Sequence, residues 1–194
     1  MRRVLNVGGA TKAIPIPQHY AGWEHLLLDI DPAQEPDVVC DARDLAQLPA
    51  GEFDAVYCSH NLEHYWRHDL PAVLAGFAHV LRPEGFAEIR VPDLMAVFAV
   101  VRERSLDLDD VLYESPMGPI TVNDVIYGYG QQIAESGDDF YAHKNAFTVK
   151  SLTNAILGAR FALVYCAPGT YEIRALAFKR PPSAEQESLL GLRA

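Results

Sequence analysis

The chain has 194 residues, of which 49% are hydrophobic and 22% are charged, a composition typical of one folded domain. A chain of this length buries about 70% of the surface that its unfolded form exposes, which excludes a disordered protein and a small disulfide scaffold. The formal net charge of −10, from 26 acidic and 16 basic residues, argues against nucleic acid as a partner, because phosphate binding needs a basic face. A polyanionic substrate is disfavoured for the same reason.

The cysteines and the apolar segments predict a cytoplasmic protein with no membrane partner. Cys40, Cys58 and Cys166 are odd in number, widely spaced and flanked by apolar residues, so we expect reduced core thiols. The basic start of the chain leads directly into a short apolar segment, without the longer apolar region of a signal peptide. The longest unbroken apolar run, residues 94–101, is too short to span a membrane.

Short apolar segments in the first half of the chain predict five parallel strands. Their two apolar faces are typical of strands buried between layers of helices. Asp69 is predicted to cap a helix over residues 70–81, whose apolar residues recur at helical spacing, and residues 82–85 to end it. The five strands are expected at residues 4–7, 26–30, 38–40, 55–58 and 86–91.

The last third of the chain predicts a terminal hairpin. Thr148 is expected to cap a helix that ends at Gly158, and residues 161–166 and 171–178 to pair as antiparallel strands. The predicted fold class is α/β: a Rossmann-like doubly wound sheet, mostly parallel, with an antiparallel C-terminal hairpin strand. The hairpin and an incomplete G-x-G-x-x-G pattern count against a nicotinamide-dependent dehydrogenase.

A long segment at residues 93–147 interrupts the alternation of strands and helices. It begins as a predicted helix at 94–104 and then becomes irregular, which after a strand end is typical of a lid or binding loop. We expect one domain at 1–180 with this lid inserted, followed by a disordered polar tail at 181–194. Residues 105–140 hold no lysine or arginine but eight acids: Asp107, Asp109, Asp110, Glu114, Asp124, Glu135, Asp138 and Asp139.

Glycines and polar residues follow four of the predicted strands. Ligands bind at the carboxyl ends of the strands in an open α/β sheet, so these residues are expected to meet at one rim. Glycines let the backbone approach a ligand closely, and Asp29 lies 20 residues beyond Gly9, a spacing at which a carboxylate reaches a ribose. The rim residues are Gly8 with Gly9, Asp29 with Asp31, Asp41, and Ser59 with His60.

Motifs that cover nearly the whole chain occur in a recognisable order. They are residues 4–9 (VLNVGG), 22–23 with 28–31, 41–45 with 48–49, 53–64 (FDAVYCSHNLEH), 80–85, 91–93, 142–144 with 147, and 171–177. In this succession the chain resembles the class I S-adenosylmethionine-dependent methyltransferases, particularly the small type-11 group.

The resemblance implies S-adenosylmethionine as cofactor and gives each rim residue a role. Because this cofactor is a sulfonium cation, an acidic rim favours it electrostatically. By the resemblance, the cofactor-binding residues are Gly8 and Gly9 beneath the methionine part, Asp29 and Asp31 at the ribose, Asp41 and the Ala42 backbone at the adenine, and Ser59 and His60 beside the methyl-donor end.

The first loop departs from the pattern of this family. Asn6 stands where the family normally has an acidic residue, and Ala10-Thr11 where it has a further glycine. Residues 10–23 contain two prolines and are not expected to form the helix that normally follows. These departures leave an alternative open, a non-catalytic methyltransferase-like module for binding or assembly with an occluded or unoccupied cofactor cleft. The thin cover at 10–23 also suits a homodimer.

His60 and His64 frame an H-x-x-E-H sequence, a pattern found in zinc peptidases. Together with His68 they are spaced by four residues and would share one face of a continuous helix. A zinc hydrolase is therefore a third alternative, but it explains none of the flanking sequence. We predict no metal site.

His64 and His143 are the candidate catalytic residues. Methyl transfer needs an acceptor atom held in line with the sulfonium methyl and, for an oxygen or nitrogen acceptor, a base with a pKa near neutrality, which favours histidine. Tyr113, Tyr127 and Tyr129 are candidates for lining an acceptor pocket. The acidic lid predicts a small-molecule acceptor that is neutral or cationic, such as an amine.

Overall fold

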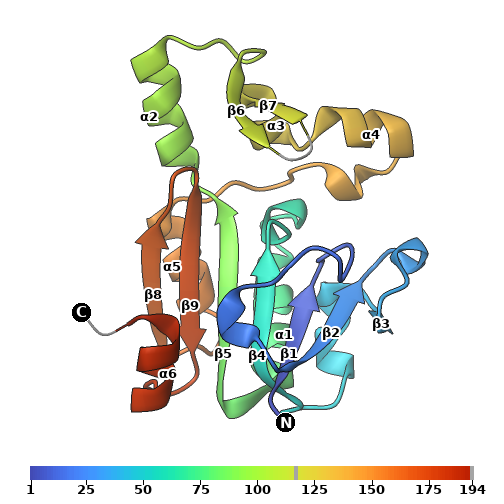
Figure 1. Cartoon of the computed structure of the whole chain (residues 1–194), viewed down its shortest axis with the longest axis vertical. Coiled ribbons are helices and arrows are strands. Elements are labelled where there is room, and N and C mark those ends of the chain that lie inside the picture. Colours follow the sequence, from blue (N-terminus) through green and yellow to red (C-terminus); the bar gives the residue numbers. More distant parts are fainter. Residues whose placement is uncertain (116–117, 193–194) are drawn as a thin grey trace.

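The computed structural model describes residues 1–115 and 118–192, which form a seven-stranded sheet of order β3-β2-β1-β4-β5-β9-β8 and its surrounding helices (Figure 1). β9 pairs antiparallel with β5 and β8, and the other neighbours pair in parallel. This confirms the predicted α/β class with its antiparallel C-terminal hairpin strand. The strands are β1 (Arg3–Val7), β2 (Glu24–Asp29), β3 (Val38–Val39), β4 (Phe53–Ser59), β5 (Leu81–Pro92), β8 (Leu163–Pro168) and β9 (Glu172–Phe178).

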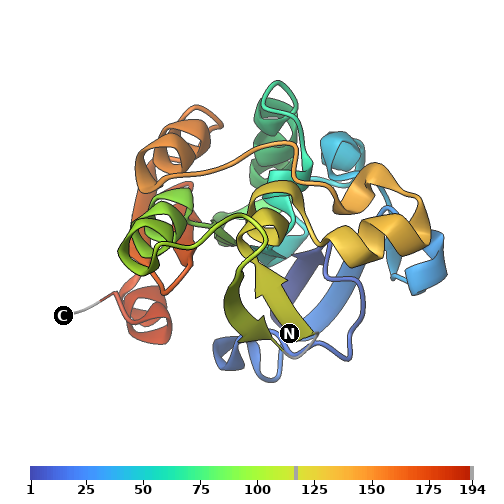
Figure 2. The ribbon, with the colours of Figure 1, turned by 90° about the horizontal axis from the view of Figure 1, so that it is seen from above.

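Helices cover the sheet on both faces. α1 (Leu70–Val80) and α5 (Val149–Leu157) lie on one face, and α6 (Ala184–Leu190) lies on the other (Figure 2). Phe77 of α1 and Leu152 of α5 are fully buried in the main core, which also contains the apolar side chains of the parallel strands. The apolar periodicity that predicted both helices is therefore the set of positions that faces this core.

The C-terminal residues differ from the predicted disordered tail. Residues 184–190 form α6, which begins after Ser183, whose side chain accepts a hydrogen bond from the backbone N–H of Gln186. Leu190 is 5% exposed and packs in a second core cluster that includes Phe178 of β9. Burial of this apolar side chain orders a segment that its polar composition alone would leave in solvent, so the prediction of disorder is wrong for these residues.

The segment between β1 and β2 lacks an α-helix, as expected. Residues 10–23, all of which the structure describes, contain the short 3-10 helix η1 (Gln18–Tyr20). Tyr20 is buried there, and its ring stacks on that of Phe86 with centroids 6.2 Å apart and an interplanar angle of 12°. Aromatic packing thus covers this face of the sheet in the absence of an α-helix within residues 10–23.

The segment 93–147, which we call the lid, stands above the carboxyl ends of the parallel strands (Figure 1). Its two ends meet, because Asp93 pairs with Phe147 in a β-bridge and the backbone N–H of Leu94 donates to the Phe147 carbonyl. Val97 and Leu112 belong to a small core of its own. Its elements are α2 (Leu94–Arg104), β6 (Val111–Ser115), β7 (Gly118–Thr121), α3 (Val122–Tyr127), α4 (Gly130–Ser136) and the 3-10 helix η5 (Asp139–Tyr141).

Within residues 1–115 and 118–192, no helix combines the length and the apolar character needed to cross a membrane. Cys58 is a buried free thiol, whereas Cys40 and Cys166 are half-buried free thiols. Burial raises the pKa of the Cys58 thiol far above its ordinary value, so this group is a core side chain rather than a nucleophile.

Candidate functional site

A cavity of about 970 Å³ lies between the lid and the carboxyl ends of β1, β2 and β4. The cleft is therefore not occluded; occlusion is one of the two states that the non-catalytic alternative expected. Gly9, Ala42 and Ser59 are predicted site residues that do not contribute to its wall. The predicted site residues that line it are Gly8, Asp29, Asp31, Asp41, His60, His64 and His143.

The glycines after β1 make room for asparagine side chains beneath the loop. Gly8 has a φ of +69°, and a Cβ at this position would overlap the side chain of Asn61. A Cβ on Gly9 would overlap the side chain of Asn6, which is buried in β1. Ala10 continues the loop with a φ of +53°, a conformation that costs a residue with a Cβ about 1–2 kcal/mol. The loop therefore follows a path suited to glycine even where this chain has alanine.

Asp29 joins the first loop to the end of β2. One carboxylate oxygen accepts a hydrogen bond from the backbone N–H of Ala10 at 3.2 Å, and the other accepts from Asp31 N–H at 3.0 Å. Each oxygen keeps a further lone pair, so the fixed carboxylate can accept from two more donors. The side chain of Asp31 is used locally, because it accepts from the Ala33 N–H at 2.9 Å and caps η2 (Pro32–Gln34).

Asp41 and Arg43 form a local ion pair at the end of β3. The Asp41 side chain caps η3 (Ala42–Gln47) by accepting from the Arg43 N–H at 2.9 Å, and it lies 2.6 Å from the guanidinium. Burial acts to raise the pKa of Asp41, but the hydrogen bonds from Arg43 outweigh it and hold that pKa below its ordinary value. The side chain of Ala42 lies in the main core rather than in the cavity.

His60 is held as a cation just after β4. It has a φ of +50°, and its ring nitrogens lie 3.3 Å from a carboxylate oxygen of Glu172 and 3.6 Å from one of Glu63. Burial acts to lower the pKa of His60, but Glu172 and Glu63 raise it to about 9. The imidazole is therefore protonated at neutral pH and does not act there as a base.

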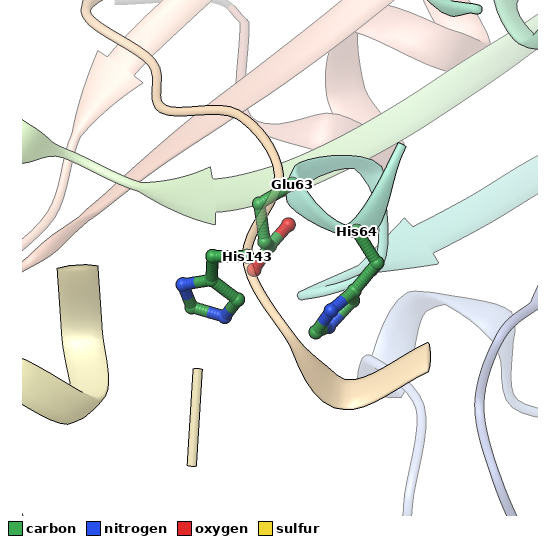
Figure 3. A group of neighbouring side chains, drawn as sticks. All are labelled: Glu63, His64 and His143. Atoms are coloured by element: carbon green, nitrogen blue, oxygen red, sulfur yellow. The ribbon is translucent and has the colours of Figure 1, made fainter. Parts of the chain in front are cut away.

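The side chains of Glu63, His64 and His143 lie close together in the cavity wall (Figure 3). Nδ1 of His64 donates to the carbonyl of Ala142 at 3.1 Å, and Nδ1 of His143 donates to that of Val125 at 2.9 Å. Burial is the main cause that lowers the pKa of His143, so its ring is neutral at neutral pH. Both rings keep Nε2 free of these bonds.

Glu63 is the functional candidate that the sequence interpretation did not select. Its side chain is 1% exposed, and neither carboxylate oxygen has a hydrogen-bond partner within the described part of the chain. Burial acts to raise the pKa of Glu63, but the neighbouring His60, His64 and His143 hold it below its ordinary value. The H-x-x-E-H sequence was the signal that contained it.

The helix that the zinc-hydrolase alternative requires is not formed. Within residues 60–68, only Leu62–His64 are helical, and they form the short 3-10 helix η4. His60 lies before this helix and has a positive φ. His60 and His64 therefore do not lie one helical turn apart on a common face, and the zinc-peptidase arrangement is wrong for this chain.

Aromatic side chains from the lid and the sheet edge face the same cavity. Tyr113 of β6 stacks on Tyr171, which precedes β9, with ring centroids 5.3 Å apart and an interplanar angle of 16°. Tyr129 also lines the cavity, as predicted. Tyr127, in contrast, is 63% exposed and does not contribute to the wall, so the prediction for it is wrong.

The cavity suits the cofactor that the resemblance implies. The fixed carboxylate of Asp29 has acceptor capacity left for a ribose diol, and Asp41 supplies a second carboxylate at the neighbouring strand end. Acidic residues outnumber basic ones in the wall, which favours a sulfonium cation.

A comparison with family models finds one match, a methyltransferase domain over residues 18–89. This range runs from η1 through β2, β3, β4 and α1 into β5, and so contains most of the rim. No curated protein matches the chain.

Many solved structures share the fold. A SAM-dependent methyltransferase of Archaeoglobus fulgidus is 16% identical, with 91% of this chain and 85% of that chain covered and a TM-score of 0.56. The PH0226 protein of Pyrococcus horikoshii is 14% identical, with 93% and 83% covered and a TM-score of 0.58. A TehB-like SAM-dependent methyltransferase of Corynebacterium glutamicum is 13% identical, with 92% and 80% covered and a TM-score of 0.51. The chain thus shares its fold with SAM-dependent methyltransferases and matches a methyltransferase domain over residues 18–89.

Proposed function

We propose that this protein is an S-adenosylmethionine-dependent methyltransferase whose acceptor is a small molecule that is neutral or cationic. The observation that carries the proposal is the charge of the cavity wall. Its only Lys and Arg residues among those described are Arg43, paired with Asp41, and Lys144, paired with Asp139. The acids in the wall are Asp29, Asp31, Asp41, Glu63, Asp69, Asp124, Asp139 and Glu172. An anionic acceptor would meet this field unfavourably, whereas an amine or a neutral hydroxyl compound would not.

The cofactor half of the cavity is proposed to lie at the ends of β1, β2 and β3. There the Gly8 backbone would border the methionine part, Asp29 would accept from the ribose hydroxyls, and Asp41 would face the adenine. S-adenosylmethionine, when bound, supplies an electrophilic methyl group on a positively charged sulfur. The chain's own contribution is to fix the nucleoside, which Asp29 can do because two backbone N–H groups already hold its carboxylate.

The acceptor half is proposed to lie beneath the lid, between the tyrosine pair and the histidines. Tyr113 and Tyr171 offer flat apolar faces, and Tyr129 adds a third ring to the wall. His64 and His143 would contact the acceptor at its nucleophilic atom, where the free nitrogen of an imidazole can accept a proton. Much of the rate of methyl transfer comes from holding that atom in line with the donor, and the lid above the strand ends would provide such positioning.

A transfer assay tests this proposal. S-adenosylmethionine labelled in its methyl group would be incubated with the protein and two matched panels, one of amines and neutral phenols, the other of phosphorylated and polycarboxylated compounds. We expect label to appear only in compounds of the first panel. Label transferred preferentially to phosphorylated or polycarboxylated compounds would contradict the acceptor class and leave the fold assignment in place.

A further inference from the structure

We propose that Glu63, His64 and His143 bind one divalent transition-metal ion. Each of the three residues offers one ligand atom, and these atoms all lie within 4.8 Å of one another (Figure 3). A metal with ligand bonds near 2.0–2.2 Å, as Zn²⁺ has, reaches three atoms spaced in this way with small side-chain adjustments. The site uses His143 of the lid in place of His60, and so differs from the zinc-peptidase arrangement excluded above.

Both histidines are presented as ligands by the hydrogen bonds that they already make. A carbonyl oxygen can only accept, so the contacts from Nδ1 to Ala142 and Val125 place a proton on each Nδ1. Nε2 of each ring is then the nitrogen with a free lone pair. A hydrogen bond from the N–H of the other ring nitrogen to a backbone carbonyl is the arrangement that fixes ligating histidines at metal sites.

Glu63 supplies the independent evidence for a cation. A buried carboxylate without a hydrogen-bond donor is costly, and such groups in native proteins are normally paired or coordinate a metal. Both carboxylate oxygens of Glu63 are buried and lack a hydrogen-bond partner among the described residues. The nearest ring nitrogen of His60 lies 3.6 Å away, beyond hydrogen-bond distance, so that ion pair leaves the requirement unmet.

The backbone holds the three ligands in place without the ion. The N–H groups of Lys144 and Asn145 donate to the Glu63 carbonyl at 2.8 and 3.1 Å, and the His143 N–H donates to Tyr127 at 2.9 Å. Glu63 and His64 are adjacent in η4, so the same contacts fix the backbone of all three residues. The site is thus preformed, and little ordering would oppose ion binding.

The donor set indicates which ions the site takes. Two imidazoles and one carboxylate suit Zn²⁺, Fe²⁺ and other first-row transition metals, whereas Mg²⁺ and Ca²⁺ prefer an all-oxygen shell. Three protein ligands leave coordination positions open, as in catalytic rather than structural sites. All three residues line the cavity, so those positions face the proposed acceptor half. With the ion bound, the ion would take the place of the two imidazoles in contacting the acceptor's nucleophilic oxygen or nitrogen. That role rests on the proposed function, whereas the binding of the ion does not.

Calorimetric titration of the tag-free, EDTA-treated protein with Zn²⁺, in the absence of cofactor, tests the inference. We expect one Zn²⁺ per chain, and binding of Mg²⁺ at least a hundredfold weaker. His143→Ala, His64→Ala and Glu63→Gln should each weaken Zn²⁺ binding at least tenfold. His68→Ala is the matched control, because that side chain is 80% exposed and pairs with Asp69 outside the cluster, and it should bind Zn²⁺ like the unaltered protein.

Several outcomes would overturn the inference: no stoichiometric Zn²⁺, an affinity unchanged in the cluster variants, or an equal loss in His68→Ala. Circular dichroism checks that each variant folds. If Glu63→Gln does not fold, the result rests on His143→Ala and His64→Ala, because those two side chains are only half-buried. A parallel titration with S-adenosylhomocysteine separates this inference from the proposed function. Binding of S-adenosylhomocysteine without Zn²⁺ would overturn the metal site alone, whereas Zn²⁺ binding without S-adenosylhomocysteine would overturn the proposed function alone.

Discussion

The imidazole rings of His64 and His143 meet edge to face with centroids 5.0 Å apart, although His64 follows β4 and His143 belongs to the lid. Each ring is oriented by a backbone carbonyl, and His64 takes that carbonyl from Ala142, next to His143 in the chain. The lid and the sheet edge are therefore joined at the residues that face the cavity. Changes in the lid are expected to alter acceptor binding more than cofactor binding.

Tyr113→Ala tests this separation of the two halves. Loss of the stack on Tyr171 removes an aromatic pair of about 1 kcal/mol and one apolar face of the acceptor half. For an acceptor found in the transfer assay, we expect KM to rise about fivefold with little change in S-adenosylhomocysteine affinity. Tyr127→Ala is the control, because its exposed ring lies outside the wall, and its KM should stay within twofold of the unaltered enzyme. Equal effects of the two variants would contradict the placement of the acceptor.

Gly8→Ala tests the packing of the first loop. The variant places a Cβ against the side chain of Asn61 in a residue with a φ of +69°. Gly51 has the same φ, but a Cβ there meets nothing within 4 Å in the described structure, so Gly51→Ala isolates the backbone strain. We expect Gly51→Ala to lower the free energy of unfolding by about 1–2 kcal/mol and Gly8→Ala to lower it by a further 1–3 kcal/mol or so. Urea unfolding of both variants measures the difference; equal losses would show that Asn61 yields without cost.

Glu88 is the centre of a buried ionic cluster on the sheet face opposite α1. Its side chain is 0% exposed and accepts hydrogen bonds from His19 at 2.8 Å, Tyr20 at 3.1 Å, Arg174 at 2.8 Å and Arg90 at 3.0 Å. Glu88→Gln keeps the shape but removes the counter-charge of Arg174 and one of the two carboxylates that pair with Arg90, so we expect a loss of about 3–5 kcal/mol in the free energy of unfolding.

The control for Glu88→Gln is Glu84→Gln, which breaks an exposed pair with Arg180. Such pairs contribute about 1 kcal/mol or less. Urea unfolding at pH 7 compares the two variants. A small effect of Glu88→Gln, similar to that of Glu84→Gln, would contradict the assigned importance of the buried cluster.

The lowered pKa of Glu88 predicts how the free energy of unfolding depends on pH. Burial acts to raise the pKa of Glu88, but its hydrogen bonds to His19 and Arg174 lower it from 4.5 to about 2. Because the folded-state pKa lies below the unfolded value, the contribution is fully present above about pH 4.5 and is lost as pH falls toward 2. The shift corresponds to about 3 kcal/mol. Between pH 5 and 2.5 the unaltered protein should lose more unfolding free energy than Glu88→Gln; parallel losses would contradict the shift.

Much of the fold follows from local sequence patterns. Local sequence encodes the apolar segments of five strands, the helix after Asp69 and the helix that Thr148 caps. The structure contains all of them. The structure differs from the sequence prediction where strand pairing or tertiary packing determines the local conformation. β5 begins at Leu81 because that residue pairs with Phe53 of β4, and α6 forms because Leu190 finds a core cluster.

The candidate site was predictable only where it lies at strand ends. Asp29 and Asp41 reach the cavity because parallel strands end at one edge, which the order of strands already implies. His143 meets Glu63 through contacts of the lid that no periodicity encodes. Ser59 occupies a strand end without lining the cavity, since alternate side chains of a strand face opposite ways.

Calorimetric titration with S-adenosylhomocysteine tests the central claim, that the cavity rim is a cofactor site anchored by Asp29. We predict one S-adenosylhomocysteine bound per chain, and an affinity at least tenfold weaker in Asp29→Ala, because that change removes the carboxylate proposed for the ribose. Asp109→Ala removes an equal charge from an exposed part of the lid and should leave the affinity unchanged. No binding at millimolar S-adenosylhomocysteine, or an affinity unaltered in Asp29→Ala, would contradict the account.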